Sequence, residues 1–542
     1  MPDFSASRGG VVAAIILLLA ALGVGTALRM PDLGSRPMHL DEAILGFKFG
    51  ELLETGKWEY DPKDYHGPAL PYVTLPFAWA TGHSEVSGIS EELLRTVPFV
   101  FCMAIMVAGL GLARGMGAPA CGFAGLFLAV SPMFVYYSRY YIMEMLLVFF
   151  CLCSILCGWR YYLSRRPLWL VPLGISLAMM HATKETCVIH YFAMAGGVAG
   201  CWLTNFFRPG VGEELEAQLK ETPLRWSHLK VLISAAAIVW LVMFTSFFTI
   251  FPQGLVESIT TYGSYLARAE GAGGHEKPWF YYFQILLWHR DYYLWTEAGL
   301  YVLAIVGAAG AFFGRPKSGS STNLTRFLTF YVVLLGATYS AISYKTPWTI
   351  MGFHHAVILL AGFGSVVLLA LFKHVIARIV IFILIGGVCV HLGAQAKLAT
   401  STILEADVRN PYVYSHTSTN FMKLVKKLDQ LAAAKGGDDW LQVKVVHFQS
   451  AWPLPWYTRM HRNSLQFSSG LSDEMLAEAD VIITEPLTSA SPNYVKRVHA
   501  QLRERGAEFT DYGFQTLRPD HFLSVQIRAS LWEKFLEGTL DK

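Results

Sequence analysis

The sequence predicts an α-helical protein that crosses a membrane about eleven times and ends in a small soluble α/β domain. Of its 542 residues, 54% are hydrophobic and only 15% are charged, whereas a soluble protein carries about 25% charged residues. The charges are also unevenly placed, because residues 401–542 hold 33 of the 83 charged side chains. These observations exclude a soluble globular enzyme and predict a membrane domain over residues 1–399 and a water-soluble domain over residues 400–542.

Eleven stretches are apolar enough to form membrane helices, which need about 20 residues each to cross a bilayer. Each stretch is expected to form a helix, because a helix satisfies the hydrogen bonds of its own backbone N–H and C=O groups inside the lipid. The first stretch is interpreted as an uncleaved anchor rather than a signal peptide, because ten more follow it. The expected spans are residues 9–29, 96–114, 118–137, 142–163, 167–183, 186–207, 229–251, 297–314, 327–344, 348–372 and 376–396.

Lysine and arginine near the ends of these spans predict the orientation of the chain, because cytoplasmic loops carry an excess of both. Alternate connections hold such residues, for example Arg165 and Arg166. The remaining connections, including loops 30–95 and 252–296, and the C-terminal domain are then expected on the extracytoplasmic side of the cell (inner or plasma) membrane. The net charge is only +3 and no block of Lys and Arg occurs, which argues against nucleic acid as a partner.

Loop 30–95 contains the first candidate functional residue, Asp41. The segment Arg36-Pro37-Met38-His39-Leu40-Asp41-Glu42 precedes an amphipathic stretch, so Asp41 is expected at or near the N-terminus of a helix. Free backbone N–H groups and the helix dipole favour a carboxylate there, where it could act as a base or a metal ligand. The alternative is that Asp41 only caps the helix.

Several further ionisable residues fall on the same predicted side of the membrane. Glu144 begins a membrane helix, where an unpaired carboxylate is costly and needs a partner, a cavity or a cation. Some of these residues could instead form structural salt bridges or be snorkelling lysines, but their agreement on one side favours a site. Besides Asp41, Glu42 and Glu144, the candidates are His66, Arg139, Lys184, Glu185, Arg268, Lys345 and His354.

Taken together, these motifs resemble the C-type (GT-C) superfamily of glycosyltransferases that use polyprenyl-phosphate sugars, near the protein O-mannosyltransferases and the lipid A aminoarabinose transferases. The similarity is greatest to a subfamily labelled flippase-activity-associated, and it covers about residues 30–460. The segments that carry it are MHLDEAILGFKFGELLETG, YDPKDYHGP, SRYYIMEMLLVFF, ATKET, SYKTPW and AWPLPWYTR. The resemblance implies Asp41 as the principal catalytic carboxylate, Glu42 as its neighbour in an Asp-Glu motif, and Glu144 as a second acidic residue.

The expected reaction is transfer of a hexose or pentose from a polyprenyl-phosphate donor to a hydroxyl of a lipid, glycan or protein. Asp41 is the candidate base, and Arg139, Lys184, Arg268 and Lys345 are candidate cations for the phosphate. Glu42, His66 and Glu144 could orient the acceptor or hold a divalent cation, although no ligand spacing demands a metal. The alternatives are a transporter or flippase for polyprenyl-linked glycans, and an inactive member that only binds them.

The charged tail is predicted to be a small α/β domain. Short apolar runs at residues 443–448 and 479–484 read as strands, and residues 494–505 as a helix. The aromatic segment Trp452-Pro453-Leu454-Pro455-Trp456-Tyr457 is suited either to stacking on a sugar or to packing on the membrane domain.

Overall fold

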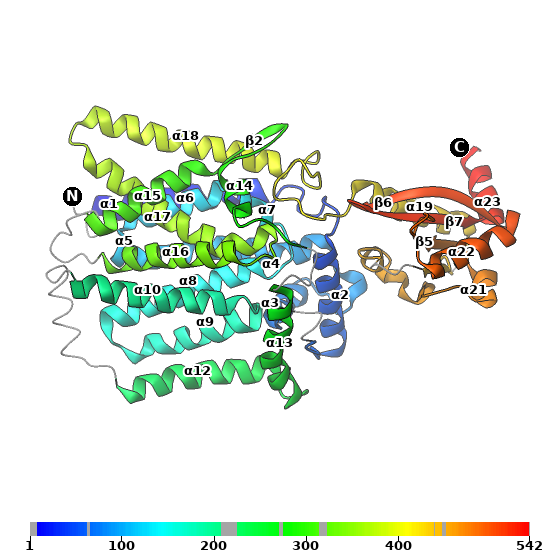
Figure 1. Cartoon of the computed structure of the whole chain (residues 1–542), viewed down its shortest axis with the longest axis horizontal. Helices are drawn as coiled ribbons and strands as arrows, with labels where there is room; N and C mark the ends of the chain where they lie inside the picture. Colours follow the sequence, from blue (N-terminus) through cyan, green and yellow to red (C-terminus); the bar gives the residue numbers. More distant parts are fainter. Residues whose placement is uncertain are drawn as a thin grey trace.

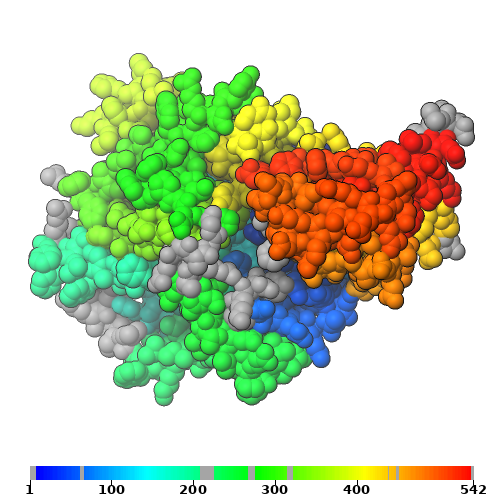
Figure 2. Space-filling view, turned by 45° about the vertical axis from the view of Figure 1, so that its right-hand side comes forward, coloured from blue at the N-terminus to red at the C-terminus, as the bar shows by residue number. Residues whose placement is uncertain are grey.

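The computed structural model describes residues 8–61, 66–207, 225–269, 275–313, 322–437, 439–446 and 451–540. Most of the long helices run side by side in one bundle, and the C-terminal domain stands at one end of it (Figure 1). A short helix, α2 (Leu40–Thr55), lies between the two parts. The space-filling view shows the C-terminal domain standing against the helical domain (Figure 2).

The helical domain contains a helix or helical turn at every predicted span. A two-stranded antiparallel ribbon, β1 (His289–Asp291) and β2 (Tyr293–Trp295), lies in the predicted loop 252–296. In addition to α2, the helices are α1 (Arg8–Arg29), α3 (Ala69–Ala80), α4 (Glu91–Gly109), α5 (Ala113–Met116), α6 (Ala118–Val130), α7 (Pro132–Tyr137), α8 (Glu144–Ser164), α9 (Leu170–Thr183), α10 (Cys187–Phe207), α12 (Trp226–Phe244), α13 (Gln253–Ala269), α14 (Tyr281–Leu287), α15 (Ala298–Phe313), α16 (Asn323–Ala341), η4 (Pro347–Ile350), α17 (Met351–Leu371) and α18 (Val375–Ala399).

Eight of the eleven predicted spans are, within the described residues, helices long and apolar enough to cross a membrane. The other three, which contain α6, α9 and α15, are shorter apolar helices. The third span breaks after Val130, because Pro132 lacks a backbone N–H and starts the new helix α7. The protein is therefore a multi-pass membrane protein, as the composition predicts.

Helices α6 and α17 form the centre of the bundle, since both are buried along most of their length. Glycine allows α15 to approach α17 closely. A Cβ at Gly364 would stand 1.8 Å from the carbonyl oxygen of Leu303 on α15, so only glycine fits there.

The C-terminal domain is a five-stranded mixed sheet with helices, which confirms the predicted α/β class. The strand order is β4-β3-β5-β7-β6, with β3 parallel to β4 and β5, and β7 antiparallel to β5 and β6. A linker, residues 400–418, connects α18 to this domain. The elements are α19 (Thr419–Lys435), β3 (Val443–Val446), α20 (Leu454–Tyr457), β4 (Leu465–Ser468), α21 (Asp473–Glu478), β5 (Val481–Thr484), α22 (Asn493–Glu504), β6 (Phe509–Arg518), β7 (His521–Arg528) and α23 (Ala529–Leu540).

The aromatic segment of the tail packs on the membrane domain, as one of the two sequence alternatives expects. Trp456 on α20 is fully buried, and its indole N–H donates a 2.7 Å hydrogen bond to Glu91 on α4. The hydroxyl of Tyr457 accepts a hydrogen bond from the backbone N–H of Met38. A Cβ at Gly46 on α2 would lie 2.7 Å from the Trp456 ring, so the close approach of α20 to α2 depends on that glycine.

Replacing Gly46 by Ala tests this junction. We expect Gly46→Ala to destabilise the protein by about 1–3 kcal/mol through overpacking, measured as a lower thermal unfolding midpoint in detergent. The matched control is Gly263→Ala on α13, where nothing lies within 4 Å of the new Cβ and the same gain in helix propensity applies. Equal midpoints for the two variants would mean that the junction tolerates a side chain at residue 46.

Candidate active site

Helix α2 begins at Leu40 because His39 caps it. The Nδ1 atom of His39 accepts a 3.1 Å hydrogen bond from the backbone N–H of Asp41, and the Nε2 atom lies 3.2 Å from the carbonyl oxygen of Tyr414. An accepting Nδ1 leaves Nε2 to carry the proton and donate. Burial lowers the pKa of His39, which favours this neutral ring. Asp41 is therefore near the helix N-terminus, as predicted, but the alternative that it serves only as the cap is wrong.

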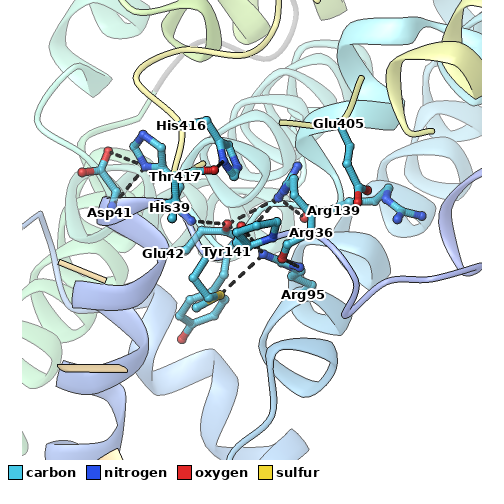
Figure 3. A network of polar contacts seen from close by, with 12 residues as sticks. Arg36, His39, Asp41, Glu42, Arg95, Arg139, Tyr141, Glu405, His416 and Thr417 are labelled. Carbon is cyan, nitrogen blue, oxygen red and sulfur yellow. Dashed lines mark hydrogen bonds and ion pairs between the residues drawn. The ribbon is translucent and has the colours of Figure 1, made fainter. Parts of the chain in front are cut away.

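Glu42 points the other way, into a buried cluster of arginines (Figure 3). Its carboxylate accepts hydrogen bonds of 2.9 and 3.1 Å from Arg95 and weaker ones of 3.4 Å from Arg36. The backbone N–H of Tyr141 donates a further bond of 2.9 Å. Burial alone would raise the pKa of Glu42, but the two arginines outweigh it and hold that pKa well below its usual range.

A cavity of about 370 Å³ opens beside the start of α2. Its wall brings together five of the predicted site residues, Asp41, His66, Glu144, Lys184 and Glu185. They come from α2, the segment before α3, the start of α8 and the connection between α9 and α10. The rest of the wall is mainly apolar and aromatic, and is formed by Ile44, Leu45, Ile142, Met143, Thr186, Val188, Ile189, Tyr262, Tyr265, Leu266, Tyr339, Ile342, Tyr344, Thr346, Trp348 and Thr349.

Two of the three cavity carboxylates are paired. The ammonium group of Lys184 donates a hydrogen bond to Glu144, so the carboxylate at the start of α8 has the partner that the lipid environment demands. Glu185 lies 2.7 Å from Nδ1 of His66. Burial disfavours the charged form of Glu185, but His66 outweighs it and lowers the pKa of this carboxyl.

Asp41 differs from the other two carboxylates. Its side chain is 44% exposed, and its Oδ2 atom lies 3.8 Å from the neutral ring of His39. A partly exposed carboxylate on a cavity wall is available to a substrate hydroxyl, which is the geometric requirement for a general base.

Arg139 and His354 are buried elsewhere and do not line this cavity. Arg139 donates hydrogen bonds to the carbonyl oxygens of Arg29, Pro31 and Asp32, and therefore shapes the chain between α1 and α2. His354 on α17 lies 2.8 Å from Glu297 in a fully buried pair.

Lys345 stands beside the cavity, between the wall residues Tyr344 and Thr346. Its ammonium group donates to the carbonyl oxygens of Ile342 and Lys277, and no carboxylate partner is recorded for it in the described parts of the chain. Burial lowers the pKa of Lys345, because the charged form is poorly solvated there. The remaining candidate, Arg268, belongs to the last turn of α13, and its side chain lies outside the described residues.

The sequence did not point to two residues that pair with predicted site residues, Arg95 with Glu42 and Glu297 with His354. Arg95 lies one residue before a predicted span, and Glu297 is the first residue of another, where it accepts hydrogen bonds from Ser131 and Tyr412. The rule that drew attention to Glu144, a carboxylate at the edge of the lipid, applies equally to Glu297. Within the described residues, no group of three or more His, Cys, Asp or Glu side chains is arranged to hold a metal ion.

Comparison with known proteins identifies the fold. Over 97% of its length, the chain superposes on ArnT from Cupriavidus metallidurans bound to undecaprenyl phosphate, covering 99% of that chain with a TM-score of 0.58 and 15% identity. The chain has the GT-C fold. It also matches AglB, the oligosaccharyltransferase from Archaeoglobus fulgidus in complex with an inhibitory peptide and a dolichol-phosphate, with a TM-score of 0.51 and 10% identity over 87% of this chain and 69% of that one.

The family model for dolichyl-phosphate-mannose-protein mannosyltransferases matches residues 72–253 of this GT-C chain. That segment includes Glu144, Lys184 and Glu185 and begins after Asp41. A search of curated protein sequences gives no match. The GT-C fold expected from the sequence is thus confirmed, and membership of the flippase-associated subfamily stays a prediction.

The cluster around Glu42 predicts a pH-dependent loss of stability. We expect Glu42→Gln to destabilise the protein by about 3–5 kcal/mol at pH 7, because Arg36 and Arg95 lose a buried partner. The matched control, Glu51→Gln on the exposed face of α2, should change stability by less than about 0.5 kcal/mol. The measurement is the thermal midpoint in detergent.

The same measurement at several pH values shows in which direction the stabilisation by Glu42 changes with pH. Since the folded-state pKa of Glu42 is depressed, its contribution is fully present above its unfolded pKa of about 4.3 and declines as the pH falls below that value. The gap between wild type and Glu42→Gln should therefore narrow below about pH 4. A gap that is constant across this range would contradict the assignment.

Proposed function

We propose that this protein is an inverting glycosyltransferase that moves a sugar from a polyprenyl-phosphate donor to an acceptor hydroxyl at the extracytoplasmic face of the membrane. The observation that carries the proposal is the combination of a partly exposed carboxylate, which accepts no hydrogen bond from a cation among the described residues, with an apolar cavity at one end of a GT-C bundle. The structures that share the fold are described with undecaprenyl phosphate and with a dolichol-phosphate.

Asp41 acts as the base. Its carboxylate removes the proton of the acceptor hydroxyl while the hydroxyl oxygen forms a bond to the anomeric carbon of the donor sugar. The bond between that carbon and the phosphate oxygen breaks, and polyprenyl phosphate leaves with the electron pair. Because the acceptor oxygen and the leaving phosphate stand on opposite sides of the anomeric carbon, the configuration at this carbon inverts.

The phosphate needs a cation as its negative charge grows. Lys184 and His66 already pair with Glu144 and Glu185, whereas Lys345 is bound only to carbonyl oxygens in the described structure. A phosphate oxygen is a stronger acceptor for an ammonium group than a carbonyl oxygen. Lys345 is therefore the residue that we assign to the leaving group.

The apolar wall of the cavity suits the hydrocarbon chain of the donor. Val188 and Ile189 on α10, Leu266 on α13 and Ile342 after α16 line it together. Val188 and Leu266 are also exposed on the surface of the helical domain, so a polyprenyl chain has a route from the bilayer to the cavity. The lysine and arginine pattern of the short loops supports the extracytoplasmic side for this end of the bundle and for the C-terminal domain.

The first test of this reaction is Asp41→Asn. With purified protein and a panel of polyprenyl-phosphate sugars, we expect wild type to release free polyprenyl phosphate and the variant to lose at least about 100-fold in turnover, the lower end of a general base contribution. Asp291→Asn, an exposed residue on β1, controls for the loss of a carboxylate. Both variants should unfold at the wild-type temperature, and retained turnover in Asp41→Asn would refute the base.

The second test concerns the donor phosphate. We expect Lys345→Gln to weaken binding of undecaprenyl phosphate by about 10-fold, the equivalent of one charge-assisted hydrogen bond. Lys373→Gln, between α17 and α18, removes the same charge at the other end of the bundle and should bind as wild type does. Equal affinity in all three proteins would exclude Lys345 as the phosphate ligand.

The same assay separates the enzyme from the transporter alternative. A flippase would move labelled polyprenyl-phosphate sugar across a vesicle membrane without releasing polyprenyl phosphate. Two buried histidines of the described spans give this alternative no support, since His190 is bonded to Tyr331 and Tyr339 and His354 to Glu297. Each therefore has a structural partner within the bundle.

A further inference from the structure

The turn between β6 and β7 brings a residue of the C-terminal domain close to the candidate base. Arg518 is the last residue of β6 and is paired with His521, the first residue of β7. The carbonyl oxygen of the preceding Leu517 accepts a 2.8 Å hydrogen bond from the backbone N–H of Ser418 in the linker. The same linker supplies the carbonyl oxygen of Tyr414 that is bonded to His39. This chain of contacts sets the β6–β7 turn beside the start of α2.

The β6–β7 turn also lies at the edge of the sheet where ligands commonly bind. The parallel strands β3 and β5 end at Val446 and Thr484, and Thr484 pairs with Ser524 near the start of β7. The β6–β7 turn therefore lies at the carboxyl end of the parallel strands, the edge at which open α/β sheets bind their ligands.

Within the described ranges, the side chain of Arg518 makes no direct bond that occupies its guanidinium. The residue is 8% exposed, and in the described part of the chain no hydrogen bond or ion pair to its guanidinium is recorded. It interacts electrostatically with Asp41 across the domain junction. Most buried arginines here are satisfied, as Arg95 is by Glu42 and by backbone carbonyls. Among the described residues, the guanidinium nitrogens of Arg518 are not buried polar atoms that lack a partner, so they reach the surface at the domain junction. A guanidinium with five donors and no protein acceptor there is available to an anion from outside.

We propose that Arg518 binds an anionic group of the acceptor, so that the C-terminal domain selects acceptors with a carboxylate or phosphate near the hydroxyl that is glycosylated. This inference rests on the proposed function. A guanidinium binds both oxyanions through two parallel N–H···O bonds, so the two groups share one chemistry.

The position of Arg518 assigns it to the acceptor rather than to the donor. In an inverting displacement the base faces the acceptor, and the leaving phosphate lies on the far side of the anomeric carbon. Arg518 interacts with the base, Asp41, and comes from the soluble domain. Lys345 and the apolar wall belong to the membrane domain, from which the lipid donor would enter. The two cations thus serve opposite ends of the reaction.

The experiment compares two acceptors that differ in one charged group, p-nitrophenyl β-glucuronide and p-nitrophenyl β-glucoside, with the full-length protein in detergent. Binding is measured directly by titration, and transfer is measured with the donor panel. We expect wild type to prefer the glucuronide by about 10- to 100-fold. Arg518→Gln should lose most of this preference and Arg518→Lys part of it. Arg497→Gln, which removes an exposed charge from α22, should keep all of it.

Each outcome bears on one claim. A wild-type protein without preference for the glucuronide, or an Arg518→Gln variant that loses both acceptors equally, would overturn the inference, because Arg518 would then act only through Asp41 or the fold. If Arg518-dependent binding of the glucuronide is present but no donor is turned over, the anion site stands and the proposed function fails. If Arg518→Gln unfolds, the wild-type preference and the Arg518→Lys variant still decide the question.

Discussion

The buried carboxylate of Glu42 is the interaction on which the candidate site depends. Removing a charge from water costs several kcal/mol unless well-placed partners compensate, and Glu42 is compensated from three separate parts of the chain. Arg95 reaches it from α4, Arg36 from the loop before α2, and the backbone of Tyr141 from the segment before α8. Each partner is far from the others in sequence, so the cluster holds in place the elements that border the cavity (Figure 3).

The cluster explains how two adjacent acids have different roles. Successive residues of a helix point about 100° apart, so when Glu42 is fixed in the protein interior, Asp41 is directed towards the cavity and the C-terminal domain. His39 completes the arrangement, because its side chain caps the helix and its backbone N–H donates to Glu42. Asp41 is thereby relieved of the capping role. Under the proposed function, the carboxylate that we assign as the base is positioned by its neighbours and remains available to a substrate.

The sequence predicts the elements of this protein better than their contacts. Long apolar runs locate a helix at each of the eleven predicted spans, eight of them long enough, in the described parts of the chain, to cross a membrane, and the pattern after Asp41 locates α2, since both signals are local. The sequence also predicts that Asp41, Glu144 and Lys184 meet at one end of the bundle, because the number of spans between two loops decides whether they lie on the same side of the membrane. The pairing of Glu42 with Arg95, 53 residues away, and the approach of Arg518 from the tail do not follow. They depend on how helices and domains pack, which one sequence does not encode in any short pattern.

The most direct test is a structure of the full-length protein with undecaprenyl phosphate. We expect the phosphate to contact Lys345, the hydrocarbon chain to follow the apolar wall between α10 and α13, and the carboxylate of Asp41 to remain open towards the C-terminal domain. A phosphate bound elsewhere, with Lys345 still bonded to the carbonyl oxygen of Ile342, would contradict the assignment of this cavity as the donor site.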